Sequence, residues 1–127
     1  MPGTARFFLA TGCIAALLAV ALGAFGAHAL KARLAPELMA AYKTGVEYHF
    51  YHALGLVLVG LVALQLPGSA YLRGAGWAML AGIALFSGSL YLLALTGLRW
   101  PSAVTPVGGV AFIAAWGLFA AAVLGRA

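Results

Sequence analysis

The stretch that decides the fold is Lys43-Thr44-Gly45-Val46-Glu47-Tyr48-His49-Phe50-Tyr51-His52, which leads directly into the apolar run 53–66. It carries one of the two acids of the chain and two of its three histidines. The apolar run is too hydrophobic to lie anywhere but in lipid or inside a bundle of helices. The polar cluster is therefore expected at one end of a membrane-spanning helix, where we look first for function.

The composition outside this stretch is that of a membrane protein. Of 127 residues, 65% are hydrophobic and 7% are charged, whereas about 25% are charged in a typical soluble domain. A span needs about 20 apolar residues, and the apolar runs predict spans at 7–30, 47–66, 74–95 and 106–124. The predicted fold is an all-α integral membrane bundle of four helices, with residues 1–127 forming a single transmembrane domain.

The segment that precedes the second span is too long to lie wholly in lipid. Residues 36–66 contain no proline after Pro36, and as one helix they would reach about 46 Å, well beyond a hydrocarbon core of about 30 Å. We therefore predict a short interfacial helical segment over residues 37–43, between the first and second spans, with a bend near Gly45.

The basic residues indicate the partners of this chain. The formal net charge is +5, but the lysines and arginines are scattered among the helix ends, where they can reach lipid headgroups. This favours the lipid bilayer as partner and argues against nucleic acid. An even number of spans places both termini on one side. The Lys and Arg counts, three on the terminal side and four on the other, do not decide the orientation.

Small residues at helical spacing indicate where helices approach each other closely in membranes. Gly23 and Gly26 in the first span, Gly88 in the third and Gly109 in the fourth are predicted helix-packing positions. The single cysteine, Cys13, lies in the first apolar run and permits no internal disulfide.

The candidate site is a polar cluster on one side of the membrane. Ionisable groups near lipid are costly and tend to face protein or water. Glu47 is expected to pair with Lys43 one turn away, or with a histidine across a helix interface. The cluster consists of His28, Lys43, Glu47, Tyr48, His49, Tyr51 and His52.

This cluster has two interpretations. In the first, its members hydrogen-bond one another and tie the long loop to the bundle. In the second, His28, His49 and His52 bind a metal ion or haem, although no cysteine or second carboxylate lies near them in sequence. No serine elbow, carboxylate pair or phosphate-binding glycine loop is present. We therefore expect no catalytic residue, no enzyme activity and no cofactor.

Four segments resemble a known family: Gly23-Ala-Phe-Gly-Ala-His-Ala-Leu30, the stretch 45–54, Phe86-Ser-Gly-Ser-Leu-Tyr91 with 95–97 close behind, and Thr105-Pro-Val-Gly-Gly109. Together they resemble the domain-of-unknown-function family 423, also called uncharacterised protein family 0382. The resemblance implies a small four-span membrane protein and cytoplasmic termini. It supplies no catalytic or cofactor-binding residue.

The combined expectation is a multi-pass protein of the bacterial inner membrane whose molecular function is unknown. We expect a structural, accessory or assembly component of a larger membrane complex or of a homo-oligomer. The alternatives are a histidine-based metal or haem binder and a small oligomeric transporter of solutes or protons.

Overall fold

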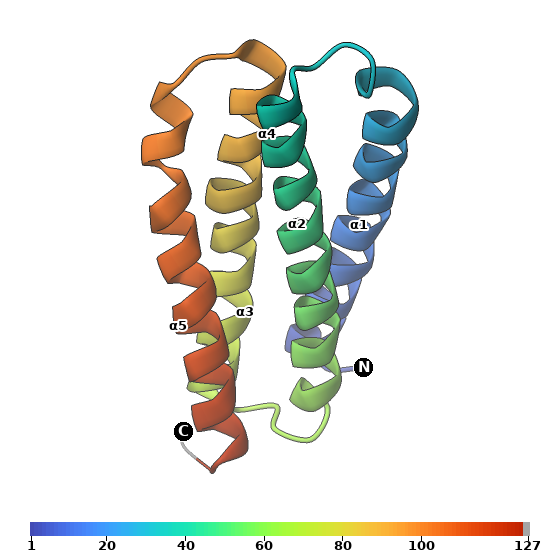
Figure 1. Ribbon diagram of the computed structural model, residues 1–127. Helices are drawn as coiled ribbons and strands as arrows, with labels where there is room; N and C mark the ends of the chain where they lie inside the picture. Colours follow the sequence, from blue (N-terminus) through green and yellow to red (C-terminus); the bar gives the residue numbers. More distant parts are fainter. Residues whose placement is uncertain (126–127) are drawn as a thin grey trace.

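The computed structural model describes residues 1–125 as four helical rods joined by short connections (Figure 1). The first rod is α1 (Gly3–Phe25) with the π-helix η1 (Gly26–Leu30), and the second is α2 (Pro36–Ala63). The third comprises α3 (Ala70–Gly82), the π-helix η2 (Ile83–Ser87) and α4 (Gly88–Thr96). The 3₁₀ turn η3 (Trp100–Ala103) leads into the fourth, α5 (Thr105–Val123). The described residues contain no strand.

Local chemistry explains where the rods begin and end. Pro36 occupies the first turn of α2 after the extended Ala35, a position where the missing N–H costs nothing. Ser69 caps α3 by accepting a hydrogen bond from the Leu72 N–H at 3.1 Å. Gly97 ends α4 in the left-handed conformation, with φ of 73°, which glycine adopts without steric cost.

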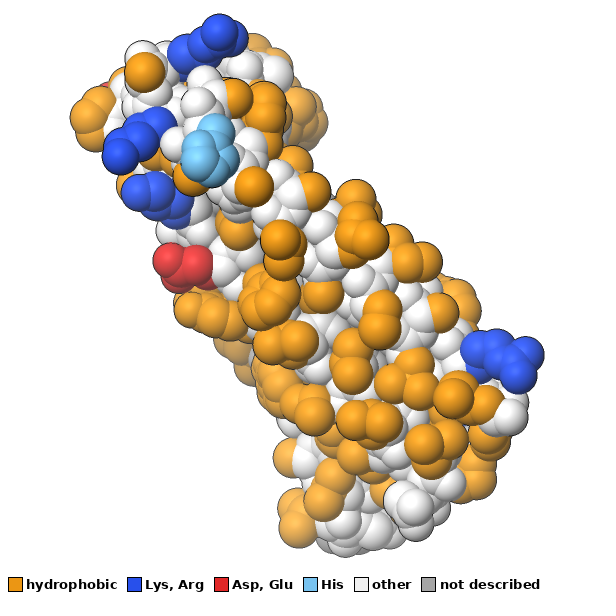
Figure 2. Space-filling view, turned by 90° about the vertical axis from the view of Figure 1, so that its right-hand side faces the viewer, with side chains coloured by type: hydrophobic (Ala, Val, Ile, Leu, Met, Phe, Trp, Pro, Cys, Tyr) orange, Lys and Arg blue, Asp and Glu red, His pale blue; other side chains and the backbone are white. Residues whose placement is uncertain are grey.

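All four rods are long and apolar enough to cross a membrane: Gly3–Leu30, Pro36–Ala63, Ala70–Thr96 and Trp100–Val123. The predicted all-α four-span bundle is therefore confirmed. One face of the molecule shows a broad apolar band between basic side chains at both ends (Figure 2), as lipid contact requires. The beginning of α1 and the end of α5 lie at the same end of the bundle as the α2–α3 connection (Figure 1).

Many core positions are small residues, and many large apolar side chains face outward. Alanines are buried in all four rods, whereas Leu17, Leu58 and Ile113 are exposed. Helices approach closely where side chains are small. A Cβ added at Gly12 would lie 2.8 Å from the Val57 nitrogen, and one at Gly60 would lie 2.8 Å from the Leu9 nitrogen. Contact between α1 and α2 thus depends on these two glycines.

Residues 37–43 are helical, as predicted, and they continue directly into the second span as the beginning of α2. This helix runs without interruption over 28 residues, about 42 Å, so its first turns extend past the hydrocarbon core. Gly45 does not bend the helix. It is buried, and a Cβ there would lie 3.0 Å from the ring of Tyr91, so the absent side chain makes room for a tyrosine of α4.

Candidate functional site

The buried polar side chains of α2 point into the bundle and meet partners from three other rods. Tyr42, His49 and His52 are almost fully buried, and their spacings of seven and three place them on one helical face. Tyr91 of α4 and Trp116 of α5 contact this face. We call these five side chains the interior network.

His52 has both ring nitrogens occupied. Its Nδ1 lies 2.8 Å from the backbone carbonyl oxygen of Tyr48, and its Nε2 lies 3.0 Å from the indole Nε1 of Trp116. A carbonyl oxygen can only accept and an indole N–H can only donate. His52 is therefore neutral, with the proton on Nδ1 and the Nε2 lone pair engaged by Trp116. The ring also stacks on Phe112, with centroids 3.5 Å apart.

His49 connects three rods. Its Nδ1 lies 2.8 Å from the hydroxyl of Tyr91, and the ring also interacts with the backbone of Ala15 in α1. Both contacts are satisfied when Nε2 donates to the Ala15 carbonyl and Nδ1 accepts from the Tyr91 hydroxyl. His49 is thus a structural link between α1, α2 and α4.

Tyr42 joins α2 to α1 near the π-helix η1. Its hydroxyl donates a hydrogen bond to the backbone carbonyl oxygen of Leu22, and its ring fills the space that a side chain at Gly26 would occupy. Leu22 lies in the last turn of α1, and its carbonyl also accepts from the backbone N–H of Gly26. The position of the tyrosine ring therefore depends on the absence of a side chain at Gly26.

Two serines behave differently at the junction of η2 and α4. Ser89 donates to the Phe86 carbonyl at 2.8 Å and lies 2.5 Å from the Thr105 hydroxyl, so it links the third and fourth rods. Ser87 does not return a hydrogen bond to its own helix. Its Oγ is the one buried side-chain polar atom within residues 1–125 that has no partner.

The remaining members of the polar cluster face outward. Lys43, Glu47 and Tyr51 are exposed, as their four-residue spacing predicts for one helical face. The expected pairing of Glu47 is wrong, since across residues 1–125 no side chain forms an ion pair or hydrogen bond with Lys43 or Glu47. His28 is exposed at the end of the first rod.

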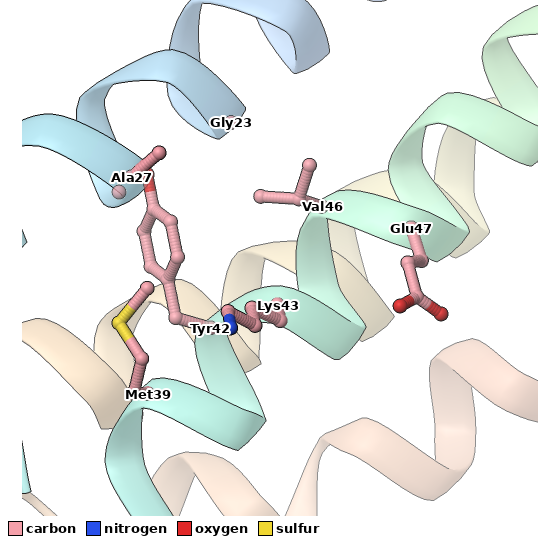
Figure 3. A pocket seen from close by; sticks show the side chains of 8 residues that line it. Gly23, Ala27, Met39, Tyr42, Lys43, Val46 and Glu47 are labelled. Carbon is pink, nitrogen blue, oxygen red and sulfur yellow. The ribbon is translucent and has the colours of Figure 1, made fainter. Parts of the chain in front are cut away.

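A groove lies between η1 and α2 on this outer side. Its volume is about 190 Å³, and Lys43 and Glu47 lie on its α2 side (Figure 3). The Glu47 carboxylate and the Lys43 side chain lie apart, and the Tyr42 side chain crosses toward the turn that carries Ala27 (Figure 3). We call it the outer groove; its lining is Gly23, Gly26, Ala27, Met39, Tyr42, Lys43, Val46 and Glu47.

The predicted three-histidine metal site is not assembled within one chain. His28 is exposed while His49 and His52 are buried in separate hydrogen bonds. Over the described range, no three His, Cys, Asp or Glu side chains converge on a point that an ion could occupy. His49 and His52 lie three residues apart on α2, but their rings contact different neighbouring helices.

The four predicted packing glycines have different surroundings. A Cβ at Gly26 would overlap the ring of Tyr42, whereas one at Gly23 or Gly109 would make ordinary contacts of 3.4 Å to Val46 and 3.8 Å to Phe86. The prediction is wrong for Gly88 within one chain, because a Cβ there would meet no atom within 4 Å. Gly88 instead lies beside a shallow external hollow near Trp100.

Gly26 and Gly88 thus form a matched pair for testing. Gly26→Ala should lower the free energy of unfolding by about 1–3 kcal/mol, because the new Cβ displaces the buried Tyr42 ring. Gly88→Ala should instead raise it by up to about 1 kcal/mol, because alanine has the higher helix propensity and no atom opposes its Cβ. Unfolding in mixed detergent micelles measures both values, and equal stability of the two variants would contradict the packing described for Tyr42.

Sequence reasoning missed two partners of the histidines, Tyr91 and Trp116, as members of the site. A signal for Trp116 was present, because an indole N–H in the middle of an apolar helix requires an acceptor. Tyr42 could also have been found, since it precedes His49 by seven residues and so shares its helical face.

Comparison with known proteins shows what this chain resembles. The family model described as "Protein of unknown function (DUF423)" matches residues 22–109. The UPF0382 membrane protein YwdK of Bacillus subtilis is 51% identical over 111 residues, which cover 87% of this chain and 90% of that protein.

Further relatives extend across bacterial groups. The UPF0382 membrane protein SH2409 of Staphylococcus haemolyticus is 40% identical over 111 residues, covering 87% of this chain and 89% of that protein. The UPF0382 inner membrane protein YgdD of Escherichia coli K12 is 44% identical over 115 residues, covering 91% and 87%. No solved structure matches significantly.

Proposed function

Since the chain belongs to the DUF423 family of multi-pass membrane proteins, whose molecular function is unknown, we propose its role from its own geometry. It acts as a structural or accessory component of a larger membrane complex. It has no catalytic activity of its own and no resident cofactor. By analogy with the relative called an inner membrane protein in Escherichia coli, we place it in the bacterial inner membrane. We further propose that both termini lie in the cytoplasm.

The observation that carries this proposal is the distribution of paired and unpaired polar groups. The ring nitrogens of His49 and His52 are engaged by side chains and backbone of the same chain. Lys43 and Glu47, which have no partner within the described residues, face outward. Ionisable groups at membrane depth normally face protein, so this surface favours contact with another protein.

The alternative of metal or haem binding has less support. A histidine binds a metal through a neutral ring nitrogen with a free lone pair, and Trp116 occupies that lone pair on His52. Binding there would first require the indole hydrogen bond to break. A transport path would likewise have to open between the buried side chains of the interior network.

The size of the solubilised assembly tests this proposal. Extraction of the native protein in mild detergent should yield a species well above both the 13.0 kDa chain and its dimer, containing other membrane proteins and no stoichiometric metal or haem. Native mass spectrometry and absorbance spectra provide the readouts. Stoichiometric haem or metal, or solute flux in proteoliposomes with the pure protein, would overturn the proposal.

A further inference from the structure

One face of α2 combines outward charges with a continuous apolar stripe. Lys43 and Glu47 are followed along the same helical face by Tyr51, Leu54, Leu58 and Leu61, all exposed. Steps of three and four residues keep such a stripe on one side of a helix. We call these six residues the outer stripe.

The depth of Glu47 makes its exposure unusual. Gln65, just beyond the end of α2, is 18 residues from Glu47, or about 27 Å along the helix. With Gln65 at one surface of a hydrocarbon core of about 30 Å, Glu47 lies just inside the opposite surface. A carboxylate facing lipid at that depth is costly and calls for a cationic neighbour.

The described residues do not supply that neighbour within one chain. Lys43 is one turn closer to the headgroups, yet it forms no ion pair with Glu47, and the two side chains lie apart in Figure 3. The other cations on this side, Lys31, Arg33 and Arg99, belong to the connections between rods. The described part of the chain therefore leaves Glu47 free to pair with a cation of another molecule.

We propose that the chain forms a parallel homodimer through the outer stripe, in which Glu47 of each copy pairs with Lys43 of the other. A two-fold axis along the membrane normal places identical surfaces face to face, so that each contact occurs twice. By symmetry, the second copy's Lys43 lies at the same depth as the first copy's Lys43, one helical turn from Glu47. The two chains then contribute two cations and two carboxylates, which neutralise one another.

The surface beside the stripe suits such a contact. An apolar extension of the outer groove, with a volume of about 470 Å³, runs between α1 and α2 past Ala19, Val20, Ala24 and Phe50. Small residues on α1 leave room for side chains of a second α2, and close packing is the main source of helix association in membranes. Tyr51 and Leu54 project from the stripe beside this extension.

The decisive experiment reverses the charges on separately tagged copies. Lys43→Glu alone and Glu47→Lys alone should each reduce recovery of a second copy from membranes by about tenfold, because every interchain pair becomes repulsive. Lys43→Glu co-expressed with Glu47→Lys should restore recovery to within about twofold of the native protein, since both pairs are then attractive. Such rescue also shows that each variant folds.

Crosslinking locates the contact independently. In a Cys13→Ser background, Leu54→Cys should crosslink efficiently between copies, whereas Ile113→Cys on the exposed face of α5 should not. A monomeric native protein, a failure of the charge-reversed pair to recover, or a phospholipid or different protein bound at the stripe in native mass spectrometry would overturn the proposal. The inference rests on the same outward charges as the proposed function. The two can fail separately, because a dimer and a larger complex differ in mass.

Discussion

Gly108→Ala should lower the free energy of unfolding by about 3 kcal/mol, at the upper end of the range for overpacking a well-filled core. Gly108 is buried at the start of α5, and an added Cβ would overlap the backbone nitrogen of Phe86 and lie 2.7 Å from its Cα. Backbone atoms cannot rotate away as a side chain can. The methyl group would therefore force α5 away from η2 and strain the nearby hydrogen bond between Ser89 and Thr105.

Gly109→Ala is the matched control for this prediction. It lies in the same helical turn, and its Cβ would make only ordinary contacts of 3.8 Å and longer with the Phe86 ring. Replacing glycine by alanine in a helix gains roughly 1 kcal/mol from propensity at either position, so the difference between the variants isolates the overlap. Unfolding in mixed micelles measures it. Similar stability for both variants would show that α5 does not approach η2 so closely.

Breaking the hydrogen bond between His52 and Trp116 should have the second largest effect. His52→Leu leaves the indole N–H of Trp116 without an acceptor, and an unsatisfied buried group costs about 1–3 kcal/mol. The Tyr48 carbonyl keeps its backbone hydrogen bond within α2. Trp116→Phe leaves Nε2 of His52 unpaired at a similar cost. The double variant should lose less stability than the sum of the losses in the two single variants, because it leaves neither polar group without its hydrogen-bond partner.

Two further measurements accompany this double-mutant cycle. Trp77→Phe is the control for loss of an indole, because Trp77 is exposed on α3 and should change stability by less than about 0.5 kcal/mol. Nitrogen NMR of His52 should find the proton on Nδ1 across the neutral pH range. Additive losses in the cycle, or a proton on Nε2, would contradict the hydrogen bonding described for the interior network.

The sequence by itself determined the class of protein and the course of the chain along each helix. Apolar runs of sufficient length can only be spans. Helices begin or end at Pro36, Ser69 and Gly97 because of the local chemistry of these three residues. Four-residue spacing also placed Lys43, Glu47 and Tyr51 on one face, because helical phase is a local property. The helical segment 37–43 was predicted from sequence, but nothing in sequence shows that Gly45 accommodates Tyr91 rather than a bend.

Only the tertiary structure decided which face of each helix points inward and which side chains meet. In a soluble protein the apolar face marks the core, but lipid tails are as apolar as leucine, so hydropathy does not distinguish the inside of this bundle from its outside. His52 finds Trp116 across 64 residues of sequence, and Gly108 meets the Phe86 backbone, through the rotation and depth of whole helices. The rotation and depth of each helix are set by close packing of small residues between rods. No single segment of the sequence determines this packing alone.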